Sequence, residues 1–444
     1  MSAALEYHRA TDYAPGDWEE QEDQRYIGDK PAVFKDYGDA ERLPLELSAA
    51  GPLLRDGAGI VGSQGGRDYG GGTIHWRAYS SAGGLFPVEA YVADADGLYS
   101  FDPLTPGFVA VGGGDASERI ASAVAAEAGT FVVLTGIHGR TGWKYLERGY
   151  RHIWWDAGTM LANLLALAAA DDLSPRLYVG FVDSELDAAV NADGVSEYAL
   201  AVLALGRDGA AGSAARARCA QPQPEASRRF AFAEAAHTAS KLGDADAVRS
   251  WREQGRVNGS EQETPAEEPK VARQQLLAAI RARRSVRRYA PTPLPRPALE
   301  ELLRWSEAPI PADVSRVVEQ RVTVAAVEGL DPGLYDAQLN LLRTSDEQEL
   351  REAAWFAAME QDHPKLAAVD VWQLADLEDV VARLGDRGYR WAQLEAGIRA
   401  GRLQVGAVML GWGAAACTFY DLEVSKLLET HEAPMLMVAV GPRG

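Results

Sequence analysis

Cysteine is the residue that this chain most clearly lacks, with only Cys219 and Cys417 among 444 residues. Two cysteines so far apart in sequence form neither a disulfide framework nor the paired spacing of a zinc site. Cys417 ends an apolar run that begins at residue 414, and this context predicts a small buried side chain. We therefore expect no metal site.

Positive charge is also scarce, because 44 lysines and arginines face 64 acidic residues and leave a net charge of −20. Such a surface repels phosphate backbones and anionic lipids, so we expect neither a nucleic-acid nor a membrane partner. The N-terminus has no basic region followed by an apolar core, and so predicts no secretion signal. The longest apolar run, at residues 157–170, is shorter than the ~20 residues that span a bilayer and predicts a buried helix. These absences predict a soluble, cytoplasmic protein.

What the chain does contain is an internal repeat. The sequence Arg148, Gly149, Tyr150, Arg151 recurs letter for letter at residues 387–390. Further matches follow in the same order and at nearly constant spacing, pairing residues 97–99 with 333–335, 156–158 with 395–397, and 181–185 with 419–423. One four-residue match can arise by chance, whereas an ordered series indicates a duplicated domain with diverged copies.

The copies and the segment between them define the expected organisation. At roughly 100–200 residues per domain, this length predicts two domains. We place them at residues 1–208 and 270–444, with a linker at 209–269 in which residues 225–253 have helical composition. We expect strands at 90–93, 131–134, 195–205 and 435–440, and helices at 153–170, at 270–284 and within 393–416. This mixture, without regular βαβ alternation, predicts an α+β fold.

The first candidate site is the basic run at residues 282–291, which follows an expected helix. It contains Arg283, Arg284, Ser285 and Arg287 in an otherwise acidic chain. A phosphate carries about −1.5 to −2 charges and three acceptor oxygens, which guanidinium groups and a hydroxyl satisfy well. A solvated basic helix end, favoured by the helix dipole, explains the run equally well by itself.

The second candidate is the glycine- and serine-rich run at residues 77–89, with Arg77, Ser80, Ser81 and Gly83 as its cofactor-binding candidates. Small residues let backbone approach a planar ligand closely, and serine hydroxyls and exposed amides can bond its carbonyl groups. Taken alone, the run also fits a simple glycine loop.

The third candidate is the adjacent pair Lys144 and Tyr145, just before the first Arg-Gly-Tyr-Arg repeat. A lysine base needs a pKa below its ordinary value near 10.4, and burial beside Arg148 and Arg151 is the expected cause. The second copy lacks the pair, so the shared fold does not require it. The alternative is an exposed amphipathic segment.

The fourth candidate is Gly411, Trp412 and Gly413, which leave an expected helix and precede an aromatic-acidic turn. These residues can line a flavin ring, or form a helix C-cap packed on the core.

Together these motifs resemble the nitroreductase superfamily, and most closely its SagB-type azoline dehydrogenases. Residues 6–11 are similar to that family's opening, and residues 81–89 to its Pro-Ser-Ala-Gly loop, with Ser80 in place of the proline. The Lys144–Tyr145 pair and residues 148–163 also match. The resemblance implies two fused domains that form an intramolecular pseudo-dimer with FMN between them.

The resemblance also implies residue roles. The second copy supplies the phosphate clamp, the ring contact and a late basic residue, which fall on Arg283, Arg284, Ser285, Arg287, Gly411, Trp412, Gly413 and Arg443. The first copy supplies the serine loop, at Ser80, Ser81 and Gly83, and the catalytic pair, at Lys144 and Tyr145.

The complementary set is missing, because residues 53–59 contain no clamp and residues 307–311 contain no serine loop. One of the two symmetric pockets is therefore predicted to have decayed, leaving one FMN per chain. Thr159 stands where the family often has histidine.

Three functions are open at this point. The first is an FMN-dependent dehydrogenase that oxidises azolines to azoles in a peptide, with a precursor peptide and a cyclodehydratase as partners. The second is a general NAD(P)H-dependent nitro or quinone reductase. The third is a flavin-free scaffold subunit of a peptide-modifying complex, against which the intact clamp argues.

Overall fold

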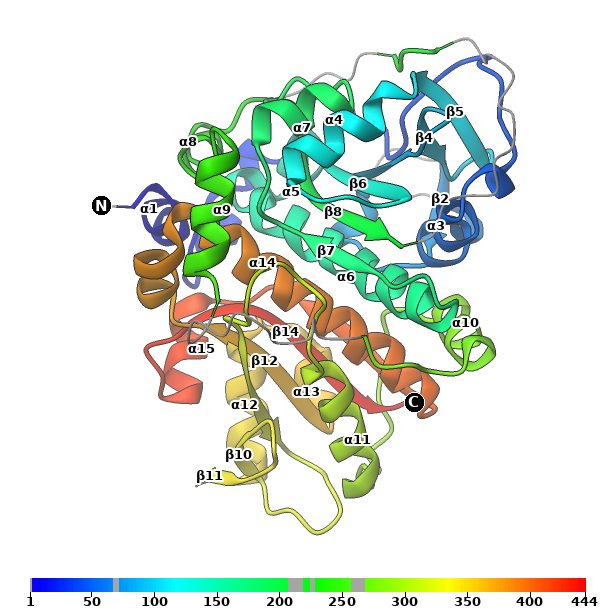
Figure 1. The fold of residues 1–444 in the computed structure, drawn as a ribbon. Helices are drawn as coiled ribbons and strands as arrows, with labels where there is room; N and C mark the ends of the chain where they lie inside the picture. The colour runs from blue at the N-terminus through cyan, green and yellow to red at the C-terminus, as the bar shows by residue number, and fades with distance from the viewer. Residues whose placement is uncertain (1, 67–71, 207–218, 224–227, 257–267) are drawn as a thin grey trace.

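The computed structural model describes residues 2–66, 72–206, 219–223, 228–256 and 268–444. Within them the chain forms two halves, each with one six-stranded sheet (Figure 1). The sheet of the first half has the order β5-β4-β3-β6-β8-β7, and that of the second half β11-β10-β9-β12-β14-β13. The strands occupy corresponding places in the two orders, so the sequence repeat is a structural repeat and the predicted α+β pseudo-dimer is confirmed.

The first half combines helices and strands without regular alternation. In chain order they are α1 (Ala3–Ala10), α2 (Asp17–Glu20), η1 (Glu22–Gln24), η2 (Leu45–Leu47), α3 (Ala50–Ala58), β1 (Ile60–Gly66), β2 (Gly72–Arg77), η3 (Ala82–Gly84), β3 (Val88–Ala93), β4 (Leu98–Asp102), β5 (Gly107–Gly112), α4 (Asp115–Val124), β6 (Thr130–Ile137), α5 (His138–Tyr145), η4 (Leu146–Arg148), α6 (Gly149–Ala170), β7 (Arg176–Tyr178), α7 (Asp183–Ala189) and β8 (Glu197–Leu205).

The segment between the halves contains α8 (Ala231–Ala239) and α9 (Ala245–Gln254). Trp251 of α9 is buried, and its indole nitrogen donates to the Leu384 carbonyl 2.9 Å away. The helical composition expected here is confirmed, and this part of the chain packs on both halves.

The second half repeats the plan. Its elements are α10 (Arg273–Ala282), α11 (Arg296–Glu307), β9 (Glu319–Val324), β10 (Gly333–Asp336), β11 (Leu341–Thr344), α12 (Glu347–Ala357), α13 (Asp362–Leu366), β12 (Val369–Ala375), α14 (Leu377–Met409), β13 (Trp412–Cys417), α15 (Asp421–Leu428) and β14 (Ala433–Pro442).

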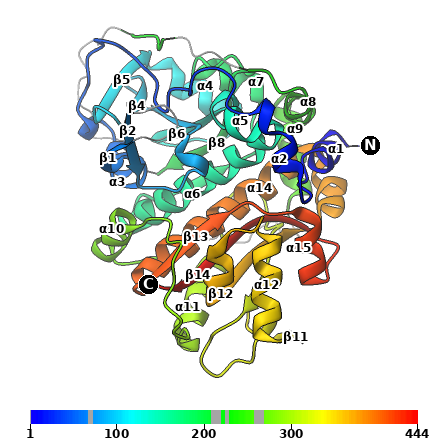
Figure 2. The same cartoon turned by 180° about the vertical axis from the view of Figure 1, so that it is seen from behind.

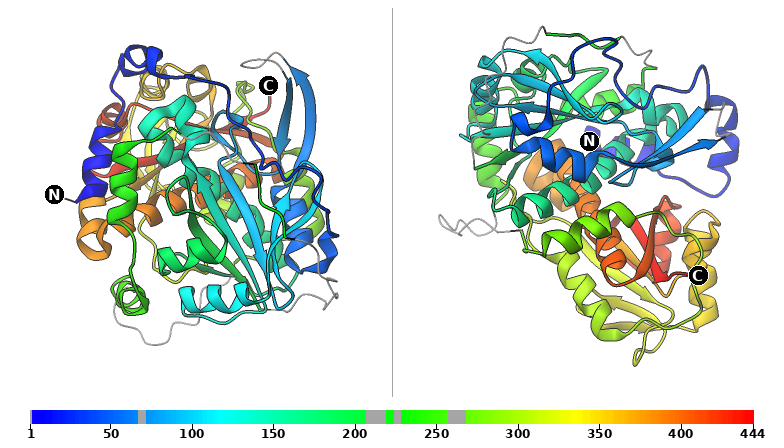
Figure 3. Two further views of the ribbon diagram at one scale, coloured as in Figure 1. Left: turned by 90° about the horizontal axis from the view of Figure 1, so that it is seen from above. Right: turned by 90° about the vertical axis from the view of Figure 1, so that its right-hand side faces the viewer.

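Helices α6 and α14 pack against each other at the centre of the molecule, between the two sheets (Figures 1 and 3). Both contain a glycine at the crossing, because a Cβ on Gly158 would lie 2.5 Å from the carbonyl carbon of Gly397. One core of buried residues therefore runs through both halves. Two smaller cores lie on the outer faces of the sheets, under α4 and α7 in one half and under α12 and α15 in the other.

The halves also share a backbone break. Gly385 interrupts α14 with a φ of 60°, and Leu146 takes a φ of 53° at the equivalent place between α5 and α6. A leucine in this region is strained by roughly 1–3 kcal/mol. Leu146 directly follows the Lys144–Tyr145 pair, so the strain lies beside a candidate site.

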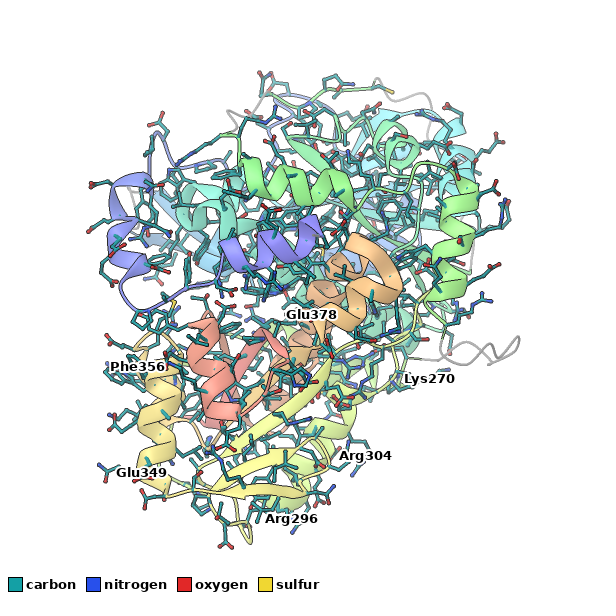
Figure 4. The ribbon with its side chains drawn as sticks, turned by 90° about the vertical axis from the view of Figure 1, so that its left-hand side faces the viewer. Lys270, Arg296, Arg304, Glu349, Phe356 and Glu378 are labelled. Atoms are coloured by element: carbon teal, nitrogen blue, oxygen red, sulfur yellow. The ribbon has the colours of Figure 1, made fainter. Side chains whose placement is uncertain are left out.

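The N-terminal helix α1 lies across the start of α14, as Figures 2 and 4 show. Glu378, labelled in Figure 4, forms an ion pair with Arg9 at 3.2 Å. The stretch from His138 to Ala170 is long and apolar enough to cross a bilayer, but 94% of its apolar window is buried in the protein. It is the core helix that the composition predicted.

Candidate functional site

The phosphate-clamp candidates follow α10 and lie along the edge of the second sheet. Ser285 forms a β-bridge with Ala414, and the amide of Val286 donates to the Ala414 carbonyl at 3.1 Å. Gly413 permits this contact, since a Cβ there would lie 2.6 Å from that of Val286. The clamp is thus fixed directly beside β13.

The late basic residue and the ring-contact candidates meet at the same edge. Tyr289 forms a β-bridge with Arg443, and the Arg443 Nε donates to the Trp412 carbonyl at 3.0 Å. Gly411 has a φ of 80°, and a Cβ on it would meet no atom within 4 Å. Open space therefore lies beside the glycine that the sequence assigned to a ring contact.

Arg283 connects this edge to the first half. Its guanidinium lies 3.2 Å from the carbonyl oxygen of Tyr79 and 3.3 Å from that of Ala78. These carbonyls immediately precede Ser80, so the clamp of one half and the serine loop of the other lie together. The central spatial expectation from the sequence is therefore met.

Buried side chains hold the serine loop in place. The Ser81 hydroxyl donates to the Asp156 carboxylate at 2.5 Å and accepts from the Phe86 amide at 2.9 Å. The Ala82 amide donates to the other oxygen of Asp156 at 3.0 Å. The Ser81 hydroxyl is thus used inside the protein, and its carbonyl accepts from the Gly84 amide at 3.2 Å. A Cβ on Gly84 would meet no atom within 4 Å, so open space lies beside the loop.

Thr159 holds the same loop from α6. Its hydroxyl donates to the Ser80 carbonyl at 2.7 Å. Two residues of this chain depart from the family pattern, Thr159 in place of histidine and Ser80 in place of proline. The first of them thus fixes the backbone of the second.

The Lys144–Tyr145 pair lies against the serine loop. A Cβ on Gly83 would lie 3.2 Å from the Tyr145 hydroxyl and 3.3 Å from the Cδ of Lys144. Gly83 also has a φ of 63°, so the loop needs glycine there for both reasons. Tyr145 is buried and stacks on His152, with ring centroids 4.0 Å apart. Burial lowers the pKa of His152 to about 3, so its ring is neutral at pH 7.

The sequence names burial beside Arg148 and Arg151 as the expected cause of activation of Lys144, and that role stays a prediction. Both guanidiniums pair with Asp421 of the second half, at 2.6 and 2.7 Å. The equivalent Arg387 and Arg390 pair with Asp183 of the first half at the same two distances. The repeated arginines therefore join the two halves.

The candidate Arg77 lies deeper in the first half. It is buried, its Nε donates to the Ala58 carbonyl at 2.8 Å, and its guanidinium lies over the Tyr79 ring. Its contacts are with the end of α3 and with the segment that leads into the serine loop, and its role toward a cofactor stays a prediction.

Arg283 carries the clearest electrostatic signal. Burial lowers its pKa to about 10, with a further contribution from Arg284. Ten arginines are buried, and seven of them form an ion pair with a carboxylate. Among the residues described, only Arg25, Arg77 and Arg283 of the ten have no such partner. A buried cation without a counter-charge costs several kcal/mol, so this arrangement suits a bound anion.

The equivalent edge of the first sheet is filled by protein. Leu177 of β7 forms a parallel bridge with Ala312, its amide donates to the Pro311 carbonyl at 2.8 Å, and the Asp313 carboxylate accepts from the Val179 amide at 2.9 Å. Residues 311–313 thus occupy the place that Ser285 and Val286 take beside β13. The first-half segment that corresponds to the clamp instead forms the β1–β2 hairpin, whose Trp76 lies under Arg284.

One other polar cluster contains His8, Asp12 and Asp421, whose ligand-type atoms lie within 4.8 Å of one another. Arg148 and Arg151 already neutralise Asp421, and Arg151 also pairs with Asp12 at 2.8 Å. These ion pairs account for the carboxylates, so the cluster joins the two halves of the protein.

Sequence reasoning missed several of these residues. Asp156 and Asp421 were visible only as matched letters of the repeat, and nothing near them in sequence named their partners. Arg25 had no motif around it. The one signal available was the repeat itself, because a carboxylate and two arginines recur in both copies.

Taken together, the doubled α+β fold and the two candidate motifs that meet between its halves are those of an oxidoreductase. The model of the Nitroreductase family matches residues 47–207 and again residues 280–442. The chain belongs to the nitroreductase family, with one copy of the domain in each half.

Three relatives illustrate the range of similarity. A candidate nitroreductase of Methanocaldococcus jannaschii is 29% identical over 186 residues, which cover 39% of this chain and 93% of that protein. The crystal structure of a candidate nitroreductase from Anabaena variabilis ATCC 29413 covers 100% of both chains, with 23% identity and a TM-score of 0.82. A chain of the E. coli microcin synthetase McbBCD complex is 20% identical, with a TM-score of 0.32, over 42% of this chain and 71% of its own. The Anabaena structure thus shares the fold over the whole length.

Proposed function

We propose that the chain binds one FMN between its halves and acts as an FMN-dependent dehydrogenase. The observation that carries the proposal is Arg283, a buried guanidinium without a carboxylate partner that lies against the backbone leading into Ser80. Its charge suits the FMN phosphate. Gly411 and Gly84, which open onto free space, suit the approach of a planar ring.

The residues divide the work between the halves. Arg283, Ser285 and Arg287 hold the phosphate, and the backbone of residues 80–84 bonds the ring. Bound FMN supplies hydride acceptance. Lys144 and Tyr145 stand beside the loop and take the substrate proton, and the aromatic residues around them exclude water.

For the finer reaction we propose oxidation of an azoline ring in a peptide to the aromatic azole, as in the SagB-type enzymes that the motifs resemble. One ring carbon loses hydride and its neighbour loses a proton to the Lys144–Tyr145 pair. A precursor peptide and a cyclodehydratase are the corresponding partners. The Lys144–Tyr145 pair, present only in the half that carries the serine loop, supports this reading over a general reductase.

Flavin stoichiometry tests the cofactor. Purified protein is expected to be yellow and to hold one FMN per chain, because residues 311–313 fill the second position. An Arg283→Gln variant is expected to bind FMN about 10- to 100-fold more weakly, which corresponds to loss of charge-assisted hydrogen bonds. Arg281→Gln is the matched control, since this exposed arginine lies two residues away on α10. A protein that stays colourless after soaking in FMN contradicts the proposal, and two FMN per chain contradicts the single site.

The reaction is tested with a synthetic peptide that contains one thiazoline. Loss of two hydrogen atoms, followed by mass spectrometry, is the expected outcome. Lys144→Ala should keep FMN and lose most of this rate. A variant with full rate removes the assignment of the base, and rapid flavin bleaching by NAD(P)H without peptide oxidation favours a general reductase instead.

A further inference from the structure

Arg25 differs from the other two buried arginines that lack a carboxylate. Arg77 and Arg283 both contact the chain around residues 77–79 and belong to the cofactor region. Arg25 comes from the N-terminal segment, between η1 and the loop that follows it, and is 7% exposed. It therefore marks a second place where a buried positive charge has no counter-charge among the described residues.

The Arg25 guanidinium is held in one orientation. It stacks on Trp18, with its central carbon 3.6 Å from the ring centroid, and its Nη2 donates to the Trp18 carbonyl. Its Nε and Nη1 are buried and have no hydrogen-bond partner among the residues that the structure describes. Buried donors without acceptors are costly, and a guanidinium presents its donors in a fixed plane that matches a carboxylate. The side chain is thus preorganised for an acceptor that no described residue of the protein supplies.

Aromatic contacts connect Arg25 to the Lys144–Tyr145 pair. The Trp18 ring lies 6.1 Å from that of Tyr145. On the other side, the Tyr26 amide donates to the Trp143 carbonyl at 2.8 Å, and the two rings meet edge to face at 4.9 Å. Leu85, at the end of the serine loop, belongs to the same apolar cluster. Arg25 therefore lies on the side of the site where the proton-transfer candidates stand, away from the clamp.

We propose that Arg25 binds a carboxylate of the substrate, so that the preferred substrates are unsaturated rings that carry an acidic group. This inference rests on the flavin site proposed above and adds the substrate class to it. The apolar cluster around Tyr145 receives the ring, and Arg25 fixes the end of the molecule that bears the charge. Such a preference runs against the net charge of −20, which repels anions at long range, so only a specific local group can produce it.

Two matched dead-end ligands test the proposal on the FMN-loaded protein. Benzoate and benzamide have nearly the same shape and differ in charge, and their binding is followed by the change in flavin absorbance. At physiological ionic strength, benzoate is expected to bind the wild-type protein about 10-fold or more tightly than benzamide. Equal or weaker binding of benzoate overturns the proposal.

Variants of Arg25 then test whether this residue causes the preference for benzoate over benzamide. Arg25→Gln should reduce the benzoate-to-benzamide ratio to about one with FMN content unchanged, and Arg25→Lys should keep part of it. Arg9→Gln is the control, because Arg9 is exposed and pairs with exposed Glu378. If Arg25→Gln fails to fold, the wild-type comparison and Arg25→Lys still decide the matter. If the Arg25→Gln protein is yellow and still binds benzoate more tightly than benzamide, the role of Arg25 is contradicted and the proposed function is not. If the wild-type protein never binds FMN, the proposed function is contradicted as well.

Discussion

Gly158 and Gly397 touch backbone to backbone where α6 crosses α14. A Cβ on Gly158 would lie 2.5–2.6 Å from three backbone atoms of Gly397 and its neighbour, closer than Cβ atoms approach other atoms in proteins. Since both glycines occupy the same place in the repeat, the crossing lies where the two halves are related by their duplication. The close approach lets the two long helices share one core.

The Gly158 contact predicts the effect of adding a single methyl group. Gly158→Ala and Gly397→Ala should each destabilise the protein by about 1–3 kcal/mol, because rigid helix backbone cannot move aside. Urea unfolding measures the change. Gly243→Ala is the control, since its Cβ would meet no atom within 4 Å. If Gly158→Ala and Gly397→Ala unfold at the same urea concentration as this control, α6 and α14 can move apart at little cost.

A second prediction concerns the reciprocal ion pairs. Burial alone would raise the pKa of Asp421, but Arg148 and Arg151 outweigh it and hold the pKa below its usual range. The same holds for Asp183 between Arg387 and Arg390.

Asp183→Asn should therefore cost about 3–5 kcal/mol of unfolding free energy, because it leaves two buried guanidiniums without a counter-charge. Asp421→Asn should fall at the lower end of this range, because it leaves Arg148 without one, whereas Arg151 keeps its ion pair with Asp12. Since the folded-state pKa is depressed, this stabilisation is present above about pH 4 and falls only in stronger acid. Asp379→Asn, which removes one oxygen of an exposed pair with Arg383, should cost less than about 1 kcal/mol. If the unfolding curves of the three variants coincide, the reciprocal ion pairs do not stabilise the protein more than an exposed pair does.

A third prediction follows from the Asp156 carboxylate under the serine loop. Burial raises its pKa to about 7. The folded protein therefore binds this proton more tightly than the unfolded chain, and the associated stabilisation is full below about pH 4 and lost as the pH rises to about 7.

Asp156→Asn removes the titration. The unfolding free energy of the wild type relative to this variant should fall by up to roughly 4 kcal/mol between pH 4 and 7 and then stay level. Thermal unfolding across this range measures it, with Asp379→Asn as the reference. If the difference in unfolding free energy between the wild type and Asp156→Asn does not change between pH 4 and 7, Asp156 does not titrate in this range. Glu395, the equivalent residue in the other half, instead pairs with Arg399 at 2.7 Å.

The fourth prediction tests Thr159 as the support of Ser80. Thr159→Val keeps the shape and removes the hydrogen bond to the Ser80 carbonyl. This hydrogen bond contributes about 1 kcal/mol, so its loss should loosen the loop and weaken FMN binding about 5-fold. The unfolding temperature should change little. Flavin fluorescence titration measures the affinity. Thr238→Val, on the exposed part of α8, should leave it unchanged.

The sequence predicted those elements whose residues are apolar throughout. Residues 153–170 and 435–440 are buried over nearly their whole length, so hydrophobicity alone marked them as core. Strand β13 was not predicted, because alanines at 414–416 carry no β-branched or aromatic signal and its pairing with β14 decides the structure. The β1–β2 hairpin was missed for a similar reason.

The candidate site was predicted where ligand chemistry is local in sequence, as in the run of arginines after α10 and the serine loop. It was not predicted where the partner lies in the other half. The carboxylate that binds Arg148 is Asp421, and the one that binds Arg387 is Asp183. Such pairs depend on how α6 and α14 pack, which the spacing along the chain does not encode.

The strand-like segment that covers β7 has an evolutionary consequence. In an assembly of two identical chains, every substitution appears twice, so a change that improves one end of a site alters its copy as well. Here residues 311–313 lie beside β7 at one of the two equivalent edges. On the proposed function, selection can therefore adjust the anion-holding residues of one half and the proton-transferring residues of the other independently, and no mutation has to suit both.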